Sequence, residues 1–227
     1  LTGIPVEQVV EVARDLARYA PNALIHPGRR ANWYGDDTQR ARSMAILNAL
    51  LGNYKMPGGL ITQKKYGVPP INFPKFKHPR VQYSSKYPLA SKVSSFEIIQ
   101  HTLEGKPWDI HGWIVYGTNL IHTSANQALT YEAITKLKFI ASIDVLPSEI
   151  TGYSDVILPE CTYLERYDDL DDRTYREPYV AIRQPAVPPM YDSKPGIEIF
   201  KILAEKMGRF DLFEDDIETY LDKRFKK

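Results

Sequence analysis

The feature that most constrains the fold is a succession of three short apolar segments in the second half of the chain. The segments 112–116, 138–144 and 155–158 are rich in β-branched and aromatic residues, and each ends at a polar or turn-forming residue. Helical spacing favours a helix over 124–137. Strand, helix, strand, turn, strand is typical of a parallel sheet with right-handed crossovers. The sequence therefore predicts an α/β fold built on a doubly wound, Rossmann-like parallel sheet.

The amino-terminal part carries a second α/β pattern. Pro5 suits the first turn of a helix, and apolar residues recur at helical spacing until Pro21 ends it. The apolar run 23–25 is expected to be a buried strand that leads into a glycine-containing loop. Residues 1–64 are interpreted as part of a first α/β domain. A second helix is expected over 38–51, with four side chains toward the core: Met44, Leu47, Leu50 and Leu51.

Scattered prolines favour an irregular connection between residues 65 and 107. Within it, Ser94 and Glu97 form a capping-box pattern for a short helix. Residues 108–210 are expected to form the second α/β unit, which binds a dinucleotide, and 211–227 a helical tail. The remaining expected elements are a strand near 179–182 and helices near 196–207 and 216–225.

Charge and hydropathy exclude some classes of partner. The chain has 29 basic and 28 acidic residues, so its net charge of +1 gives no broad attraction to nucleic acid or to an anionic membrane. No apolar run approaches the roughly 20 residues that span a bilayer, so no direct membrane insertion is expected. The opening LTGIPVEQVV has neither a basic start nor an apolar signal core, as expected of a mature, trimmed or excised chain.

Cysteine and histidine give little support for a metal site. Cys161 is the only cysteine, so this segment by itself makes no intrachain disulfide and no all-cysteine cluster. Its apolar setting predicts a buried small residue. The five histidines show no recurring ligand spacing, and we predict no metal ligand within the chain.

Two loops carry groups that suit a nucleotide, because open parallel sheets bind ligands where strands end in loops. In Gly28-Arg29-Arg30, glycine allows close backbone approach and the arginines hold phosphate or another oxyanion. A solvated basic turn is the alternative. In Gly117-Thr118-Asn119, a hydroxyl, an amide and backbone N–H groups can bind phosphate or a ribose edge. An ordinary turn is the alternative.

Asp144 ends an otherwise apolar strand. A carboxylate in this position can accept two hydrogen bonds from ribose hydroxyls, or from the N1–H and exocyclic amine of guanine. The alternative is that Asp144 caps the following turn. Both interpretations remain open at the level of sequence.

Longer stretches resemble the dimethyl-sulfoxide-reductase family of molybdopterin oxidoreductases. The strongest similarity runs over 142–149, 151–159 and 163–166, where a strand ending in Asp precedes a Thr-bearing turn, an A-D-V-I-L-P-like strand and a glutamate. Ser154 stands where relatives usually have alanine. The opening helix and the Gly52-Asn53 turn also look similar. The chain is thus expected to be an internal fragment, with units from the central domains of a catalytic subunit.

The resemblance implies cofactor and site residues. Family members hold molybdenum or tungsten between two molybdopterin guanine dinucleotides. The residues that match cofactor-contacting positions are Gly28, Gly117, Thr118, Asn119, Ile143, Asp144, Ser148 and Arg166. Arg29 or Arg30 is expected to face an anionic substrate as a catalytic group. Near Lys194-Pro195-Gly196 relatives often place an Asp for guanine, so that contact is in doubt here.

The Pro-Gly-Arg-Arg loop looks most like the polysulfide and thiosulfate reductase branch. This branch implies a respiratory enzyme at the periplasmic or outer face of the cytoplasmic membrane, with an iron–sulfur electron-transfer subunit and a membrane-anchor subunit as partners. An iron–sulfur cluster is expected only in an amino-terminal part that this sequence lacks, and the fragment alone is expected to be inactive. The alternatives are a non-catalytic scaffold, like the large iron–sulfur subunit of respiratory complex I, and a free-standing nucleotide-binding module.

Overall fold

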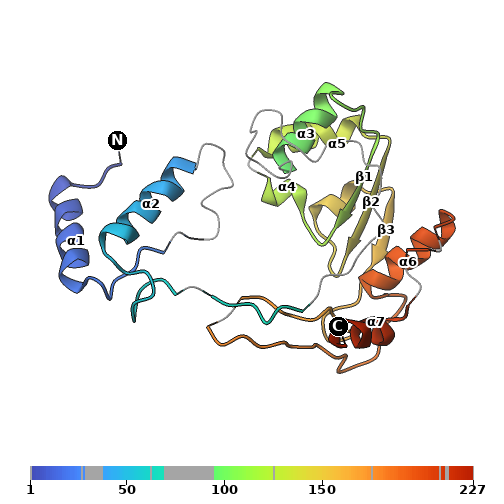
Figure 1. The fold of residues 1–227 in the computed structure, drawn as a ribbon. Helices are drawn as coiled ribbons and strands as arrows, with labels where there is room; N and C mark the ends of the chain where they lie inside the picture. The colour runs from blue at the N-terminus through green and yellow to red at the C-terminus, as the bar shows by residue number, and fades with distance from the viewer. Residues whose placement is uncertain are drawn as a thin grey trace. The chain divides into compact units, whose positions relative to one another are not determined.

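The computed structural model describes residues 2–26, 28, 38–61, 63–68, 95–124, 126–174, 176–209, 211–212 and 215–226 (Figure 1). The chain forms two compact units. Unit 1 comprises Leu1–Gly67 and Asp172–Val180, and unit 2 comprises Val68–Asp171 and Ala181–Lys227. The expected division into 1–64, 65–107, 108–210 and 211–227 stays a prediction. The return of 172–180 to unit 1, where Thr174 Oγ1 lies 2.5 Å from Gln63 Oε1, had no signal in the sequence.

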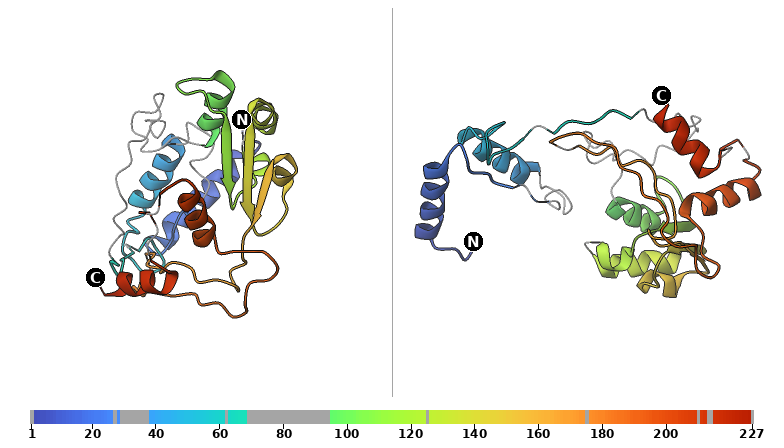
Figure 2. Two further views of the ribbon diagram at one scale, coloured as in Figure 1. Left: turned by 90° about the vertical axis from the view of Figure 1, so that its right-hand side faces the viewer. Right: turned by 90° about the horizontal axis from the view of Figure 1, so that it is seen from below.

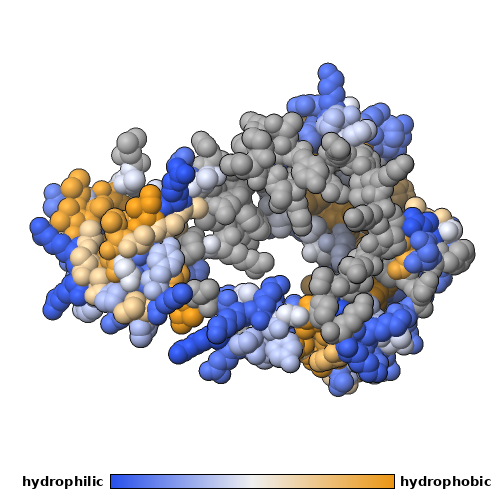
Figure 3. Space-filling view, viewed as in Figure 1, coloured by the Kyte–Doolittle hydropathy of each residue, from blue (hydrophilic) through white to orange (hydrophobic). Residues whose placement is uncertain are grey.

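Unit 1 contains the two expected helices, α1 (Val6–Tyr19) and α2 (Thr38–Leu50). Two of the four side chains expected to face the core do not: Leu47 is 47% and Leu50 is 78% exposed, whereas Met44 and Leu51 are half-buried. Helix α1 has no buried residue at all. That expectation was wrong because the described part of unit 1 provides no second layer over these faces. Figure 3 shows the resulting gathering of apolar side chains on the surface of the unit over α1 and α2.

The strand expected at 23–25 is not formed. Two buried asparagines, Asn48 in α2 and Asn53 in the turn after it, bind the backbone of this segment instead. Asn48 accepts from Ile25 N–H at 3.0 Å and donates to Ile25 O at 2.8 Å, and Asn53 donates to Ala23 O at 2.7 Å. Side-chain amides therefore replace the ladder of a neighbouring strand. Gly59 allows this packing, because a Cβ there would lie 2.1 Å from Asn53 O.

Unit 2 is built on the predicted parallel sheet. Strands β1 (Gly112–Tyr116), β2 (Phe139–Asp144) and β3 (Val156–Pro159) lie in the order β1-β2-β3, with Tyr116 paired to Ile143 and Asp144 to Pro159. The three strands run in the same direction and end at one edge (Figure 2). The α/β fold class is therefore confirmed. Central strand β2 is buried over four consecutive residues, as its continuous apolar run requires.

Helices α3 (Ser95–Glu104) and α5 (Gln127–Lys136) pack together on one face of the sheet (Figure 1). The helix expected over 124–137 is α5, which begins at Gln127 because Asn126 caps it by accepting from Leu129 N–H at 3.2 Å. The short helix α4 (Leu120–Thr123), which precedes it, was not expected. The capping residue expected for α3, Ser94, lies outside the described residues. The core on this face consists of Ile99, Trp113, Val115, Ile121, Ala133, Ile134, Ile140 and Ile150.

The opposite face of the sheet is more open, with Ile114 60% exposed. Helix α6 (Gly196–Lys206) reaches its carboxyl end, where the Phe200 and Tyr116 rings meet edge to face at 5.4 Å. Helix α7 (Ile217–Phe225) follows. The strand expected at 179–182 is reduced to one antiparallel bridge between Asp171 and Ala181. The chain enters unit 1 between these two residues, so no ladder extends from the bridge.

Two residues in unit 2 explain details of the motif that follows β2. Ser154, which stands at an alanine position of the family pattern, contacts the hydroxyl of buried Ser142 at 2.5 Å and donates to Ile150 O at 2.9 Å. Asp155 accepts from Ile140 N–H at 2.7 Å and so ties the start of β3 to β2.

Cys161 is fully buried, as predicted. Within the described ranges, no helix combines the length and apolarity needed to cross a bilayer.

Candidate ligand-binding edge of the sheet

The polar residues predicted to bind a ligand gather where the strands end. Gly117 follows β1, and its N–H donates to Ile143 O at 2.9 Å. Asp144 ends β2, and its carbonyl accepts from Glu160 N–H at 3.0 Å. The loops after β1 and β2 are therefore neighbours at one edge. Gly117 has φ +58°, a conformation that favours glycine and turns the chain sharply after β1.

The loop after β1 is linked to the loop after β2 by Asn119 and Glu149. Asn119 Nδ2 donates to Glu149 Oε2. Glu149 opens the short 3₁₀ helix η1 (Glu149–Tyr153). Its own backbone N–H, the Asn119 amide and nearby His122 all lower the pKa of this carboxyl group below its usual range. The pair was not among the predicted site residues, since nothing in the sequence links positions 119 and 149.

Two side-chain oxygens at this edge are buried and lack a hydrogen-bond partner in the part of the chain that the structure describes. They are Asn119 Oδ1 and Ser148 Oγ. The backbone carbonyl of Ser148 is satisfied by Thr151, whose N–H and Oγ1 donate to it at 3.0 and 2.6 Å. An unsatisfied buried polar atom costs about 1–3 kcal/mol, so native proteins normally supply a partner. Hydroxyl and N–H groups of a nucleotide or pterin fit these acceptors.

Asp144 combines both roles that the sequence left open. Its Oδ1 accepts from Val145 N–H at 2.7 Å and Leu146 N–H at 3.4 Å, so it does cap the next turn. Its Oδ2 makes no hydrogen bond with the residues described. The side chain is half-buried. One oxygen thus fixes the carboxylate in place while the second is available as an acceptor.

The other predicted residues of the edge differ in accessibility. Thr118 is half-buried and Gly117 exposed. Ile143 is fully buried, and its carbonyl accepts the hydrogen bond from Gly117 N–H. It therefore stabilises the ends of β1 and β2 from within the core. A direct contact between Ile143 and a ligand stays a prediction.

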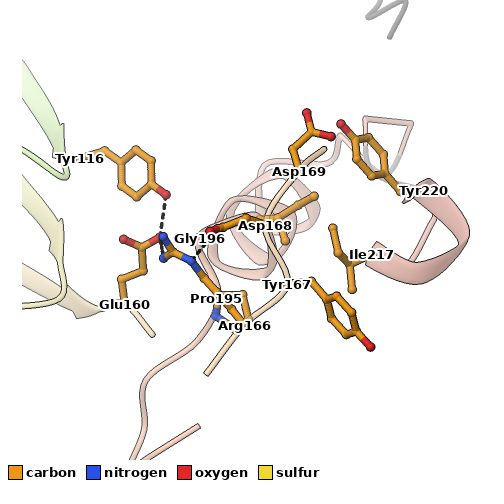
Figure 4. A pocket seen from close by; sticks show the side chains of 11 residues that line it. Tyr116, Glu160, Arg166, Tyr167, Asp168, Asp169, Pro195, Gly196, Ile217 and Tyr220 are labelled. Atoms are coloured by element: carbon orange, nitrogen blue, oxygen red, sulfur yellow. Dashed lines mark hydrogen bonds and ion pairs between the residues drawn. The ribbon is translucent and has the colours of Figure 1, made fainter. Parts of the chain in front are cut away.

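Arg166 lies in a separate pocket of about 180 Å³ on unit 2, lined by Tyr116, Asp168, the start of α6 and Tyr220 among others (Figure 4). The guanidinium forms an ion pair with Glu160, donates to Asp168 Oδ1 at 2.9 Å and donates to Cys161 O at 2.9 Å. Asp144 does not line this pocket. Arg166 is therefore engaged by protein groups, and its contact with a cofactor stays a prediction.

Glu160 is the centre of that pocket. Its side chain is 5% exposed, and Tyr116 Oη donates to its Oε1 at 2.6 Å. Burial and this carboxylate raise the pKa of Tyr116 to about 12. A Cβ at Gly196 would lie 2.4 Å from Tyr116 Oη and 2.5 Å from Glu160 Oε1. The first residue of α6 is therefore held against the buried Glu160 carboxylate and the hydroxyl of Tyr116, a residue that is 45% exposed. This cluster was not predicted, because in the sequence Glu160 is an ordinary polar residue after a strand.

The first predicted loop belongs to unit 1. Gly28 has φ +72°, and its N–H donates to His26 Nδ1 at 3.0 Å. Arg29 and Arg30 lie outside the described residues, so the roles predicted for them stay predictions. Within the described ranges, no group of three or more His, Cys, Asp or Glu side chains gathers as a metal site.

The fold defines an α/β protein whose parallel sheet carries its polar side chains at the carboxyl edge. Comparison with known proteins is more specific. Residues 11–206 match the family Molybdopterin oxidoreductase. The chain is 33% identical over 224 residues to the thiosulfate reductase molybdopterin-containing subunit PhsA of Salmonella typhimurium, covering 90% of this chain and 30% of that protein. It therefore belongs to the molybdopterin oxidoreductase family.

Further relatives are more distant. The dimethyl sulfoxide reductase DmsA of Haemophilus influenzae is 28% identical over 236 residues, which cover 95% of this chain and 28% of that protein. Among solved structures, acetylene hydratase from Pelobacter acetylenicus aligns with a TM-score of 0.49 and 18% identity, covering 59% of this chain and 20% of that one. The chain thus spans less than a third of the length of the reductases that it resembles.

Proposed function

We propose that this chain binds a pterin-guanine dinucleotide of a molybdenum or tungsten bis(molybdopterin guanine dinucleotide) cofactor at the carboxyl edge of the β1–β3 sheet. The observation that carries the proposal is the gathering of acceptors there: the second oxygen of Asp144, Asn119 Oδ1 and Ser148 Oγ. Ribose hydroxyls, guanine N–H groups and pterin N–H groups are the matching donors. Membership of the molybdopterin oxidoreductase family supports this choice of ligand.

The test uses Asp144→Asn in the intact subunit. Asparagine keeps an oxygen for the Val145 and Leu146 N–H groups but replaces the other acceptor with a donor. We expect guanine nucleotide and molybdenum or tungsten per polypeptide to fall several-fold, while the circular dichroism spectrum and melting temperature stay unchanged.

Asp192→Asn is the matched control, because Asp192 is an exposed aspartate of the same unit. It should leave the cofactor content unchanged. Wild-type nucleotide and metal content in Asp144→Asn would contradict the proposed role of this carboxylate.

We further propose that the intact protein is a respiratory reductase of a sulfur compound, such as thiosulfate or polysulfide. The support is the similarity to a thiosulfate reductase subunit. When bound, the metal supplies oxygen- or sulfur-transfer chemistry, and this chain binds the dinucleotide part of the cofactor. Reduction of thiosulfate by the purified intact enzyme with a dye as electron donor tests this. Activity with dimethyl sulfoxide alone would assign the enzyme to another branch.

By the same similarity we propose an iron–sulfur electron-transfer subunit and a membrane-anchor subunit as partners, and a location at the periplasmic or outer face of the cytoplasmic membrane. Affinity purification of the intact subunit from its native cells should recover both partners. Protease treatment of spheroplasts should degrade it. A subunit purified alone and protected from protease would overturn these assignments.

A further inference from the structure

We infer that Glu149 fixes the orientation of the Asn119 amide, so that Asn119 offers its oxygen to the dinucleotide and selects a ligand N–H or O–H group. Glu149 is thus a positioning residue. The inference rests on the proposed function of this edge. It adds a rule of polarity: at position 119 the protein side chain accepts a hydrogen bond and does not donate one.

The orientation follows from what the two side chains can exchange. An amide has a donor end and an acceptor end, whereas an ionised carboxylate only accepts. The end of Asn119 that meets Glu149 must therefore be Nδ2, as observed. Glu149 stays ionised at neutral pH, since its pKa is lowered by its own backbone N–H, by Asn119 and by His122. The amide cannot turn over without placing oxygen against oxygen.

The consequence for a ligand lies at the other end of the amide. Asn119 Oδ1 is shielded from solvent and has no partner among the described residues. It is an acceptor that needs a donor. Phosphate oxygens cannot satisfy it, because they only accept. Ribose hydroxyls and the N–H groups of guanine or pterin can.

Ser148 supplies a second polar group that needs a partner at this edge. It precedes Glu149, and its hydroxyl makes no capping hydrogen bond to η1. Its oxygen is also buried without a partner in the described chain. Asn119 and the residue before Glu149 thus each bring an oxygen without a partner among the described residues to this edge. This makes a match to one donor-rich part of a ligand more specific than either atom alone.

The decisive variants keep the contact between positions 119 and 149 but change its polarity. In Glu149→Lys the ammonium group donates to Asn119 Oδ1, so the amide turns over and offers Nδ2 to the ligand. In Glu149→Gln either orientation is possible. In Glu149→Lys the Asn119 Nδ2 group would face a donor of the ligand, and two buried donors cannot form a hydrogen bond. We therefore expect guanine nucleotide per polypeptide in the purified intact subunit to fall about tenfold or more in this variant. The fall should be smaller in Glu149→Gln.

A compensating pair separates orientation from simple loss of a contact. Asn119→Asp alone places two carboxylates together and should also lower the nucleotide content. In Asn119→Asp with Glu149→Gln, the new amide donates to the new carboxylate, whose second oxygen again accepts from the ligand. This double variant should recover most of the wild-type content. Failure to recover, in a variant with wild-type melting temperature, would contradict the inference.

The outcomes also distinguish this inference from the proposed function. If Asp144→Asn loses nucleotide but Glu149→Lys keeps wild-type content, the edge binds the dinucleotide and the polarity rule is wrong. If neither variant loses nucleotide, the proposed site itself is wrong. Glu132→Lys on the exposed side of α5 is the control for the reversal of charge, and it should leave the content unchanged.

Discussion

At the scale of single residues, capping a turn and binding a ligand are compatible roles for one carboxylate. Asp144 Oδ1 holds the turn after β2, which orients Oδ2 without further contacts. A side chain pinned in this way loses little conformational freedom when a ligand arrives. The sequence located Asp144 because a charged residue that ends a buried strand is unusual. It could not choose between the two roles, since both use the same chemical group.

At this scale the sequence did not show which side chains become hydrogen-bond or ion-pair partners. Arg166 was matched to a cofactor contact by resemblance, yet Glu160 and Asp168 take its guanidinium. Glu149 was passed over, although it lies five residues after Asp144. A local pattern gives the type of group at a position, whereas hydrogen-bond partners depend on which loops the sheet brings together.

A residue-scale prediction concerns Gly196. In Gly196→Ala the added methyl group meets the hydroxyl of Tyr116 and the carboxylate of Glu160. We expect the free energy of unfolding of unit 2 to fall by about 1–3 kcal/mol, as is usual for overpacking a buried site. Urea unfolding followed by circular dichroism measures it. Gly152→Ala is the control, because no atom lies within 4 Å of a Cβ at that position.

The cost of Gly196→Ala should be smaller in a Tyr116→Phe background, because one of the two colliding oxygens is then absent. Tyr116→Phe alone should itself destabilise the unit by about 1 kcal/mol, since it removes a donor from a buried carboxylate. Strictly additive effects in this double-mutant cycle would show that positions 196 and 116 do not interact.

At the scale of elements, prediction worked where the apolar pattern was strong. The segments 112–116, 138–144 and 155–158 became β1, β2 and β3 with shifts of at most one residue at an end. It failed where side chains compete with backbone pairing. Asn48 and Asn53 replace a strand partner for 23–25, and Asn126 caps α5 so that this helix begins at Gln127 and not at the expected residue 124. Asparagine acts through its own hydrogen bonds, which hydropathy patterns do not record.

An element-scale prediction concerns the turn after Cys161. Buried Glu165 accepts from Thr162 Oγ1 and N–H at 2.7 Å each, and from Met190 N–H at 2.8 Å. The Thr162 side chain, followed by the backbone N–H groups of Thr162 and Met190, lowers the pKa of this carboxyl group. A carboxyl group whose pKa is lower in the folded than in the unfolded state stabilises the protein at pH values above its unfolded-state pKa of about 4.3. This stabilisation is lost as the pH falls through the folded-state pKa.

Glu165→Gln should therefore flatten the decline of melting temperature below about pH 4.3 while lowering the melting temperature at neutral pH. Differential scanning calorimetry across the acid range measures both effects. Glu177→Gln, an exposed glutamate, is the control and should reproduce the wild-type curve. If the melting temperature fell equally with decreasing pH in the wild type and in Glu165→Gln, Glu165 would not contribute to the acid sensitivity of the protein.

At the scale of the whole molecule, the two units differ in how much apolar surface they bury. Unit 2 has a core cluster around Trp113, Ile140 and Ile150, whereas α1 of unit 1 exposes Val6 and has no buried residue. From the sequence alone, an α/β unit was expected in both parts of the chain. It could not reveal this difference, because periodicity shows which face of a helix is apolar and does not show whether anything covers that face.

The corresponding prediction is that the isolated chain binds a hydrophobic dye through unit 1. In Leu50→Glu, with Leu50 78% exposed, dye fluorescence should fall while the melting temperature changes little. Ile99→Glu, at a residue 1% exposed in unit 2, should instead unfold that unit. Equal dye binding by the wild type and Leu50→Glu would indicate that this surface is covered in solution.

The return of residues 172–180 to unit 1 has a consequence for the covalent chain. Because unit 1 is made from two separate stretches, a single proteolytic nick at the boundary near Gly67 does not release it as a free domain. The amino-terminal fragment would remain attached through contacts such as Gln63 with Thr174. Two separately produced polypeptides, cut at that point, should accordingly reassociate on mixing and co-elute on gel filtration.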